Sequence, residues 1–214
     1  MKKEKIIKNI TIYAIYILII WGFYRVLFKL PDNVEELILK PIIWLIPLLF
    51  LLKKEKLGIS SLGMTLKNLF PAIYLSLGLG AIFAIEAIFL NFLKYKTFNF
   101  GANIGEGGLM LSLIISFATA FSEEISFRGY VFNRLWGVLG NEWLANIMTS
   151  IVWALVHVPI TIFVWKLSFS AAVIYLFLTF LFGMGSAFVF ARTKNVFSSV
   201  LLHVLWQWPI ILFR

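Results

Sequence analysis

The chain has 214 residues, of which 61% are hydrophobic and 14% are charged, and its mean hydropathy is +0.94. This composition excludes an ordinary soluble domain, in which about 45–50% of the residues are apolar. The chain contains no cysteine, which excludes disulfides and thiolate metal sites. The formal net charge of +9 does not indicate a nucleic-acid partner, because the basic residues lie at the ends of apolar segments, where they fit lipid headgroups and topology signals better.

Seven apolar segments follow one another along the chain, and a helix needs about 20 residues to span a membrane. The second segment is short, so we expect it either to begin earlier, near Glu36, or to be re-entrant. Barrel strands would alternate apolar and polar residues, whereas these segments are apolar on every face. We therefore predict an all-α, polytopic transmembrane bundle of about seven spanning helices (six to eight), with residues 1–214 forming a single integral-membrane domain. The segments cover residues 9–29, 41–52, 69–93, 108–127, 143–165, 169–191 and 196–213.

The first segment follows several lysines, as the apolar part of a secretory signal does. Its apolar run continues from Trp21 to Phe28 without the small residues of a cleavage site. We therefore predict that this segment is retained as the first membrane helix.

The basic residues favour one orientation, because cytoplasmic ends of membrane helices carry an excess of Lys and Arg. With the N-terminus inside, twelve of the 19 basic residues fall at cytoplasmic ends, namely Lys2, Lys3, Lys5, Lys8, Lys53, Lys54, Lys56, Lys67, Arg128, Arg134, Arg192 and Lys194. The other seven, Arg25, Lys29, Lys40, Lys94, Lys96, Lys166 and Arg214, fall outside. We therefore predict a cytoplasmic N-terminus and an external C-terminus.

The fourth segment ends in an unusual run of charged residues, EEISFRG at 123–129. Ionisable groups at membrane depth are costly and usually functional. Glu124 and Arg128 are four residues apart and can form an ion pair on one helical face. Glu123 is turned by about 100° from Glu124. We therefore expect Glu123 to be a carboxylate that no arginine neutralises and that accepts a proton from water. The alternative for Glu123 is an acid facing solvent at headgroup level.

Both histidines of the chain, His157 and His203, fall inside predicted spans. Gly140 is the strongest turn signal of its region, and an antiparallel hairpin folded there would place Glu123 and His157 at one level. His203 and Gln207 are four residues apart, so that a ring N–H and an amide N–H would converge as donors to an oxyanion. The alternatives are packing histidines and a helix–helix hydrogen bond for Gln207.

Three motifs in this order carry a resemblance: Glu-Glu-x-x-Phe-Arg-Gly at 123–129, aromatic-x-x-x-His at 153–157, and His-x-x-x-amide at 203–207. Together they resemble the CPBP family, the CAAX protease and bacteriocin-processing (Abi) intramembrane proteases. The resemblance covers a catalytic core of about residues 105–210, and the first three helices match only as generic spans. It implies a hydrolase, an intramembrane endopeptidase whose substrate is membrane-associated, prenylated or leader-bearing. It also implies a location in the cell membrane.

The family's roles, carried onto the matching positions, make Glu123 the water-activating base and His157 its partner. His203 with Gln207 would stabilise the tetrahedral intermediate, and Glu124 with Arg128 would be structural or orienting. The chain departs from the family pattern at two positions. Trp153 stands where the family usually has Phe, and Gln207 stands where it has Asn or Asp, which moves the amide by one methylene.

Two mechanisms stay open from the sequence. In one, Glu123, His157 and His203 hold a zinc ion, which lowers the pKa of its bound water. In the other, which we favour, no metal takes part: Glu123 and His157 activate water, and His203 and Gln207 hold the oxyanion.

Two other functions compete with the peptidase. A proton-coupled transporter would use intramembrane Glu and His as a relay, and a non-catalytic immunity or scaffold protein would tolerate the change at Gln207. For the peptidase we expect the lipid bilayer and a peptide or protein substrate as partners, and no nucleic acid; the oligomeric state stays open. The site is expected among the fourth, fifth and seventh helices, opening toward the cytoplasmic half.

Overall fold

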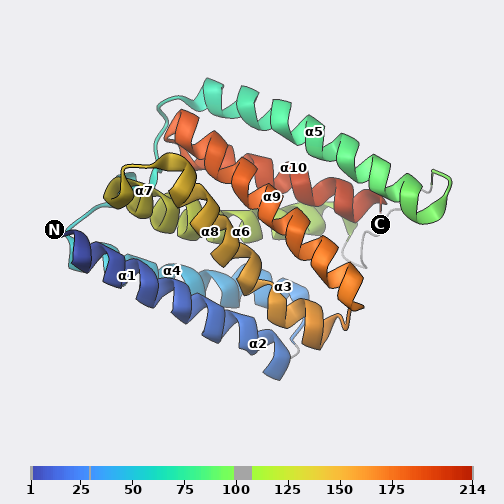
Figure 1. Ribbon diagram of the computed structural model, residues 1–214, viewed down its shortest axis with the longest axis horizontal. Coiled ribbons are helices and arrows are strands. Elements are labelled where there is room, and N and C mark those ends of the chain that lie inside the picture. Colours follow the sequence, from blue (N-terminus) through green and yellow to red (C-terminus); the bar gives the residue numbers. More distant parts are fainter. Residues whose placement is uncertain (1, 29, 99–107, 214) are drawn as a thin grey trace.

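The computed structural model describes residues 2–28, 30–98 and 108–213. Within these ranges the chain forms helices and their connections, with no β-strand, so the predicted all-α fold is confirmed (Figure 1). Three sequence predictions touch residues outside the described ranges: the positions of Lys29 and Arg214 in the charge pattern, and the beginning of the catalytic core at residues 105–107.

Seven helices run back and forth along one axis of the molecule (Figure 1). The first consists of α1 (Lys3–Tyr16), η1 (Ile17–Trp21) and α2 (Gly22–Leu27), and the second of α3 (Asp32–Val34), η2 (Glu35–Leu39) and α4 (Lys40–Glu55). A short 3₁₀ turn, η3 (Ile59–Leu62), leads to the third, α5 (Leu69–Tyr95). The fourth consists of α6 (Gly108–Glu124), η4 (Ile125–Phe132) and α7 (Asn133–Leu139), and the fifth of α8 (Glu142–Val156) and η5 (Ile160–Val164). The last two are α9 (Phe169–Thr193) and α10 (Val196–Phe213).

Five of these helices are long and apolar enough to cross a membrane: Lys3–Leu27, Leu69–Tyr95, Gly108–Leu139, Glu142–Val164 and Phe169–Thr193. A shorter apolar helix covers Val196–Trp208. The second helix begins at Asp32, so its predicted earlier start is confirmed. The chain is therefore a multi-pass membrane protein, and its helices fit the predicted polytopic bundle.

The hairpin between the fourth and fifth helices turns at Gly140, as predicted. Gly140 has a φ of 69°, a left-handed conformation that glycine adopts without steric cost. The side chain of Asn141 then accepts a hydrogen bond from the backbone N–H of Leu144 and caps α8. A local turn signal thus fixes the pairing of the two helices that carry Glu123 and His157.

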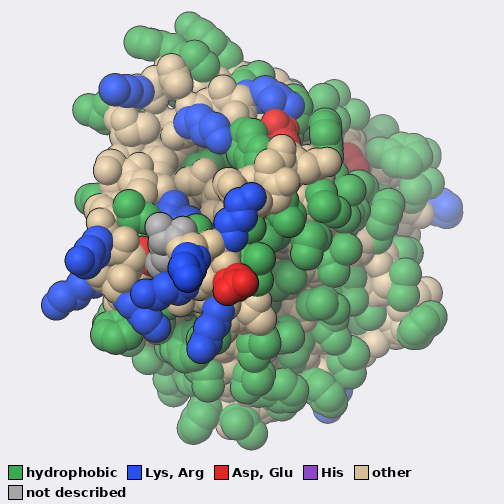
Figure 2. Space-filling view, turned by 60° about the vertical axis from the view of Figure 1, so that its left-hand side comes forward, with side chains coloured by type: hydrophobic (Ala, Val, Ile, Leu, Met, Phe, Trp, Pro, Cys, Tyr) green, Lys and Arg blue, Asp and Glu red, His purple; other side chains and the backbone are tan. Residues whose placement is uncertain are grey.

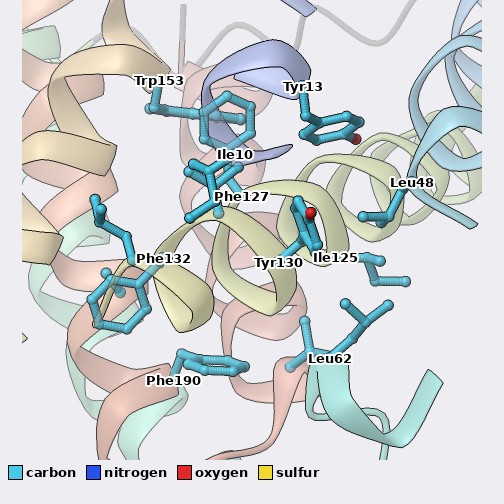
Figure 3. Close-up of a cluster of buried hydrophobic side chains, with 14 of the residues drawn as sticks. Ile10, Tyr13, Leu48, Leu62, Ile125, Phe127, Tyr130, Phe132, Trp153 and Phe190 are labelled. Atoms are coloured by element: carbon cyan, nitrogen blue, oxygen red, sulfur yellow. The ribbon is translucent and has the colours of Figure 1, made fainter. Parts of the chain in front are cut away.

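The π-helical segment η4 forms the centre of the bundle, and all eight of its residues are buried. A helix that is apolar on nearly every face must be enclosed by others. At Gly129 the enclosure is so close that an added Cβ would lie 2.8 Å from the backbone oxygen of Leu62. Figure 3 shows side chains of the neighbouring segments around η4, among them Ile10, Tyr13, Leu48, Leu62, Trp153 and Phe190.

The outer surface is largely apolar, whereas basic side chains gather at one end of the bundle (Figure 2). This is the end at which α1, α5, α8 and α10 begin and α4, α7 and α9 end (Figure 1). We call it the basic end. It carries Lys2, Lys3, Lys5, Lys8, Lys53, Lys54, Lys56, Lys67, Arg134, Arg192 and Lys194. The predicted segregation of basic residues is therefore present, except that Arg128 lies inside the bundle and is completely buried.

Candidate active site

A cavity of about 810 Å³ lies among the helices and contains the predicted catalytic residues. Glu123 comes from the end of α6, His157 from the end of α8, and His203 and Gln207 from α10. All four line this one cavity, although they are spread over 85 positions of the chain (207 − 123 + 1). The predicted common level of Glu123 and His157 agrees with this arrangement.

Glu123 is paired with a lysine from the second helix. The Nζ atom of Lys40 donates to Oε1 of Glu123 at 2.6 Å, and it also pairs with Glu36. Lys40 is only 3% exposed and Glu123 only 4%. No arginine contacts Glu123 among the ion pairs of the described residues, as expected, but the expectation of an un-neutralised carboxylate is wrong, because Lys40 reaches it from a helix distant in sequence.

Glu36 extends this polar cluster along the cavity wall. Its Oε2 accepts a hydrogen bond of 2.7 Å from the hydroxyl of Thr119 on α6. Its Oε1 lies 3.6 Å from a guanidinium nitrogen of Arg25, whose Nε is also 2.8 Å from Glu35. A buried lysine between two carboxylates is thus held from both sides, which reduces the cost of burying the three charges.

Glu124 lies behind Glu123, is completely buried and does not line the cavity. It accepts from Arg128 at 3.1 Å, as predicted, from the hydroxyl of Ser186 at 2.6 Å, and from Nδ1 of His203 at 2.8 Å. Arg128 also donates to the backbone oxygen of Gly183 at 3.3 Å. Glu124 therefore connects the buried arginine to a histidine of the cavity.

The ring orientations of both histidines follow from their partners. Nδ1 of His157 lies 2.8 Å from the backbone oxygen of Trp153, which can only accept, so Nδ1 carries a hydrogen and Nε2 is left for the cavity. Nδ1 of His203 faces the Glu124 carboxylate, and its Nε2 lies 4.0 Å from Oε2 of Glu123. In each ring, Nδ1 is hydrogen-bonded to the protein, and Nε2 is available to a ligand in the cavity.

Three π-helical segments border the cavity. Trp21 in η1, Glu36 in η2 and Ile160 in η5 line it, and η4 begins directly after Glu124. π turns inside longer helices occur frequently at functional sites. The concentration of such turns around the cavity is an observation independent of the motifs.

The comparison with known families agrees with this site. Residues 105–209 match a family model described as type II CAAX prenyl endopeptidase Rce1-like. This match agrees with the resemblance of residues 105–209 to the CPBP family of intramembrane proteases. No curated protein and no solved structure matched the chain in the corresponding comparisons. The match includes all three motifs and ends beyond Gln207, so the predicted family resemblance is confirmed.

The two departures from the CPBP pattern have clear places in the structure. The Trp153 ring lies 4.6 Å from the Arg128 guanidinium carbon and 4.8 Å from the His157 ring, so it separates the buried ion pair from the cavity. Gln207 lines the cavity, and its Oε1 is buried without a hydrogen-bond partner among the described residues. A buried amide oxygen costs free energy unless it is bonded, so this oxygen can accept a hydrogen bond from a ligand in the cavity.

The donor arrangement around Glu123 does not fit a zinc site. Among the described residues, no three His, Asp or Glu side chains are grouped so that they could hold one metal ion. The Lys40 ammonium also lies 2.6 Å from the Glu123 carboxylate. A positive charge therefore already occupies the position beside Glu123 that a metal ion would need.

Two cavity residues, Glu36 and Lys40, were not identified from the sequence, because the family motifs cover only the second half of the chain. A signal was present: the two are i,i+4 neighbours at the beginning of an apolar segment, and a cation at membrane depth needs a partner. The predicted position of the site is also incomplete, since the first helix, the second helix and α9 contribute to the cavity lining. The predicted opening on the basic side is wrong, because the exposed lining residues Asp32, Asn33 and Trp165 lie at the other end of the bundle.

Proposed function

We propose that this protein is an endopeptidase in which Glu123 and His157 activate water, and His203 and Gln207 stabilise the tetrahedral intermediate. The family match supports an intramembrane endopeptidase in general. The finer proposal is supported by one observation above all: the four side chains line a single cavity of about 810 Å³. This volume suits a short peptide segment, since ligand sites usually enclose about 300–1,000 Å³.

The role proposed for each side chain follows from its hydrogen bonds. Lys40 holds one oxygen of Glu123, and the other oxygen lies on the His203 side, where a water molecule can donate to it. Nε2 of His157 is an acceptor for a second hydrogen of that water. The proton taken by Glu123 is then available for the leaving amine of the cleaved bond.

The oxyanion is assigned to the part of the cavity lined by His203 and Gln207. His203 donates from Nδ1 to Glu124, so a hydrogen on its other nitrogen would give an N–H donor directed into the cavity. The amide N–H of Gln207 is the second donor. Such donors, placed where charge develops, lower the barrier of acyl transfer.

The experiment that tests the proposal compares three proteins in liposomes: wild type, Glu123→Gln and Glu86→Gln. Glu86 lies on α5, outside the cavity, so it controls for loss of an acid in a membrane helix. A library of membrane-anchored, prenylated and leader-bearing peptides is followed by mass spectrometry. We expect cleavage by wild type and Glu86→Gln, and none by Glu123→Gln. Cleavage that survives Glu123→Gln would show that another group is the base, and no cleavage by any protein would favour the scaffold function.

A further inference from the structure

The mouth of the cavity and the basic end lie at opposite ends of the bundle. Three lining residues are exposed: Asp32 and Asn33, at the beginning of the second helix, and Trp165, after η5. Both connections lie at the end where α2 ends and α9 begins, away from the labelled N-terminus (Figure 1). We call this the mouth end.

The cavity does not continue to the basic end. Its floor consists of buried side chains, among them Trp44, Glu123 and His203. Beyond them lies η4, whose eight residues are all buried in the core of the bundle (Figure 3). Packed cores leave few voids larger than a water molecule, so a substrate can enter only from the mouth end or from the side of the bundle.

The charges at the two ends differ strongly. The basic end carries eleven Lys and Arg residues and the acids Glu4, Glu55 and Glu142. At the mouth end, Arg25 is bound by Asp32 and Glu35, and Lys40 is buried between carboxylates. The exposed basic residues described there are Lys94, Lys96 and Lys166. Because Lys and Arg accumulate on the cytoplasmic side of membrane helices, the basic end is the cytoplasmic one.

From these two observations we infer that the site receives its substrate from the non-cytoplasmic face of the membrane. The inference rests on the proposed peptidase function and narrows its substrate class. The substrate is an exported polypeptide or an extracytoplasmic segment of a membrane-anchored protein. A polypeptide end confined to the cytoplasm does not reach the cavity through the mouth.

The absence of cysteine from the chain allows a direct test with single-cysteine variants of the full-length protein. Asn33→Cys places a thiol at the mouth of the cavity. Ser60→Cys is the matched control, since Ser60 is an exposed polar residue in the connection between α4 and α5 at the basic end. A membrane-impermeant maleimide is applied to spheroplasts and to inverted vesicles, with denatured protein as the reference for full labelling.

We expect Asn33→Cys to react in spheroplasts and Ser60→Cys to react only in inverted vesicles, each with at least a tenfold preference. The reverse pattern would overturn the inference. Reaction of Asn33→Cys from neither side, with full reaction after denaturation, would also overturn it, because the mouth would then be closed to water.

A second measurement tests whether the substrate enters the cavity through the mouth. Each single-cysteine variant is coupled to a bulky maleimide, and peptide cleavage is compared before and after coupling. Coupling at Asn33→Cys should reduce cleavage at least tenfold, and coupling at Ser60→Cys should leave it within twofold; equal effects would contradict entry through the mouth. The labelling pattern does not depend on activity, so failure of the peptidase proposal and failure of this inference are distinguishable.

Discussion

The Nζ atom of Lys40 lies 2.6 Å from Oε1 of Glu123, although the two residues are 83 positions apart in the chain. This contact joins the N-terminal helices to the motif that carries the chemistry. It also helps to explain how two acids, Glu36 and Glu123, can lie close together inside a membrane protein: Lys40 lies between them, and Arg25 is a second cation beside Glu36.

The first prediction concerns removal of that lysine. Lys40→Met leaves two buried carboxylates without their shared partner, and breaking a buried ion pair from one side costs about 3–5 kcal/mol. We expect a lower melting temperature in detergent and at least a tenfold loss of peptidase activity. Lys54→Met, at an exposed lysine of the same helix, should change neither.

The double variant Lys40→Met with Glu36→Gln decides whether charge balance is the cause. Removal of one acid together with the lysine should restore part of the lost melting temperature. If the double variant melts below Lys40→Met, charge compensation is not what stabilises the cluster.

The second prediction separates the two adjacent acids. Glu124 bonds to Arg128, Ser186 and His203 and is completely buried, so Glu124→Gln should destabilise the fold by about 3–5 kcal/mol. Glu123→Gln leaves Lys40 with Glu36 and should lose activity with a much smaller change in melting temperature. Thermal melting of both variants in one detergent checks the contrast, and equal melting temperatures would refute it.

A third prediction concerns close helix contact at Gly183. A Cβ there would lie 3.0 Å from Cβ of Ser150 and 3.3 Å from a guanidinium nitrogen of Arg128. Gly183→Ala should therefore displace Arg128 and lower the melting temperature. Gly137→Ala is the control, because a Cβ at Gly137 meets nothing within 4 Å and alanine is favoured over glycine in a helix by roughly 0.5–1 kcal/mol. Destabilisation at Gly137 equal to that at Gly183 would argue against the packing explanation.

The fourth prediction concerns Gln207 as an oxyanion donor. Gln207→Leu keeps most of the side-chain volume and removes the amide, and loss of one oxyanion donor costs about 10²–10³ in kcat. Gln207→Asn, which has the amide usual in the family, should retain much more activity than Gln207→Leu. Steady-state kinetics of both variants checks this, and equal kcat values would show that the amide does not take part.

The fifth prediction concerns the peptidase activity after treatment with a metal chelator. Because Glu123 is bound to Lys40 and no metal-binding group of three side chains is found among the described residues, purified active protein should keep its activity after prolonged dialysis against EDTA. Simultaneous loss of bound zinc and activity, with recovery of both on addition of Zn²⁺, would establish the metal mechanism instead.

Features that depend on neighbouring positions could be predicted from the sequence. The apolar segments indicated the helices, the turn signal at Gly140 indicated the hairpin, and the i,i+4 spacing indicated the pair of Glu124 with Arg128. The ordered motifs indicated the family and therefore the four residues of the cavity.

Contacts between distant segments could not be predicted in this way. The bond of Lys40 to Glu123 depends on how the second helix packs against the fourth, and the bond of Ser186 to Glu124 depends on α9. The sequence places Lys40 at the end of a span, where a lysine normally reaches water. Its partner became apparent only when the helices were assembled.

The most direct test of the central claim measures activity and folding on one preparation of Glu123→Gln. With a peptide that wild type cleaves, kcat and the melting temperature are determined for wild type, Glu123→Gln and Glu86→Gln under identical conditions. If Glu123 activates the water, Glu123→Gln should lose at least 10³-fold in kcat, since loss of a positioned general base typically costs about 10²–10⁴-fold, while it still unfolds cooperatively near the wild-type temperature. A folded Glu123→Gln protein with a kcat within tenfold of wild type would contradict the assignment of Glu123 as the base.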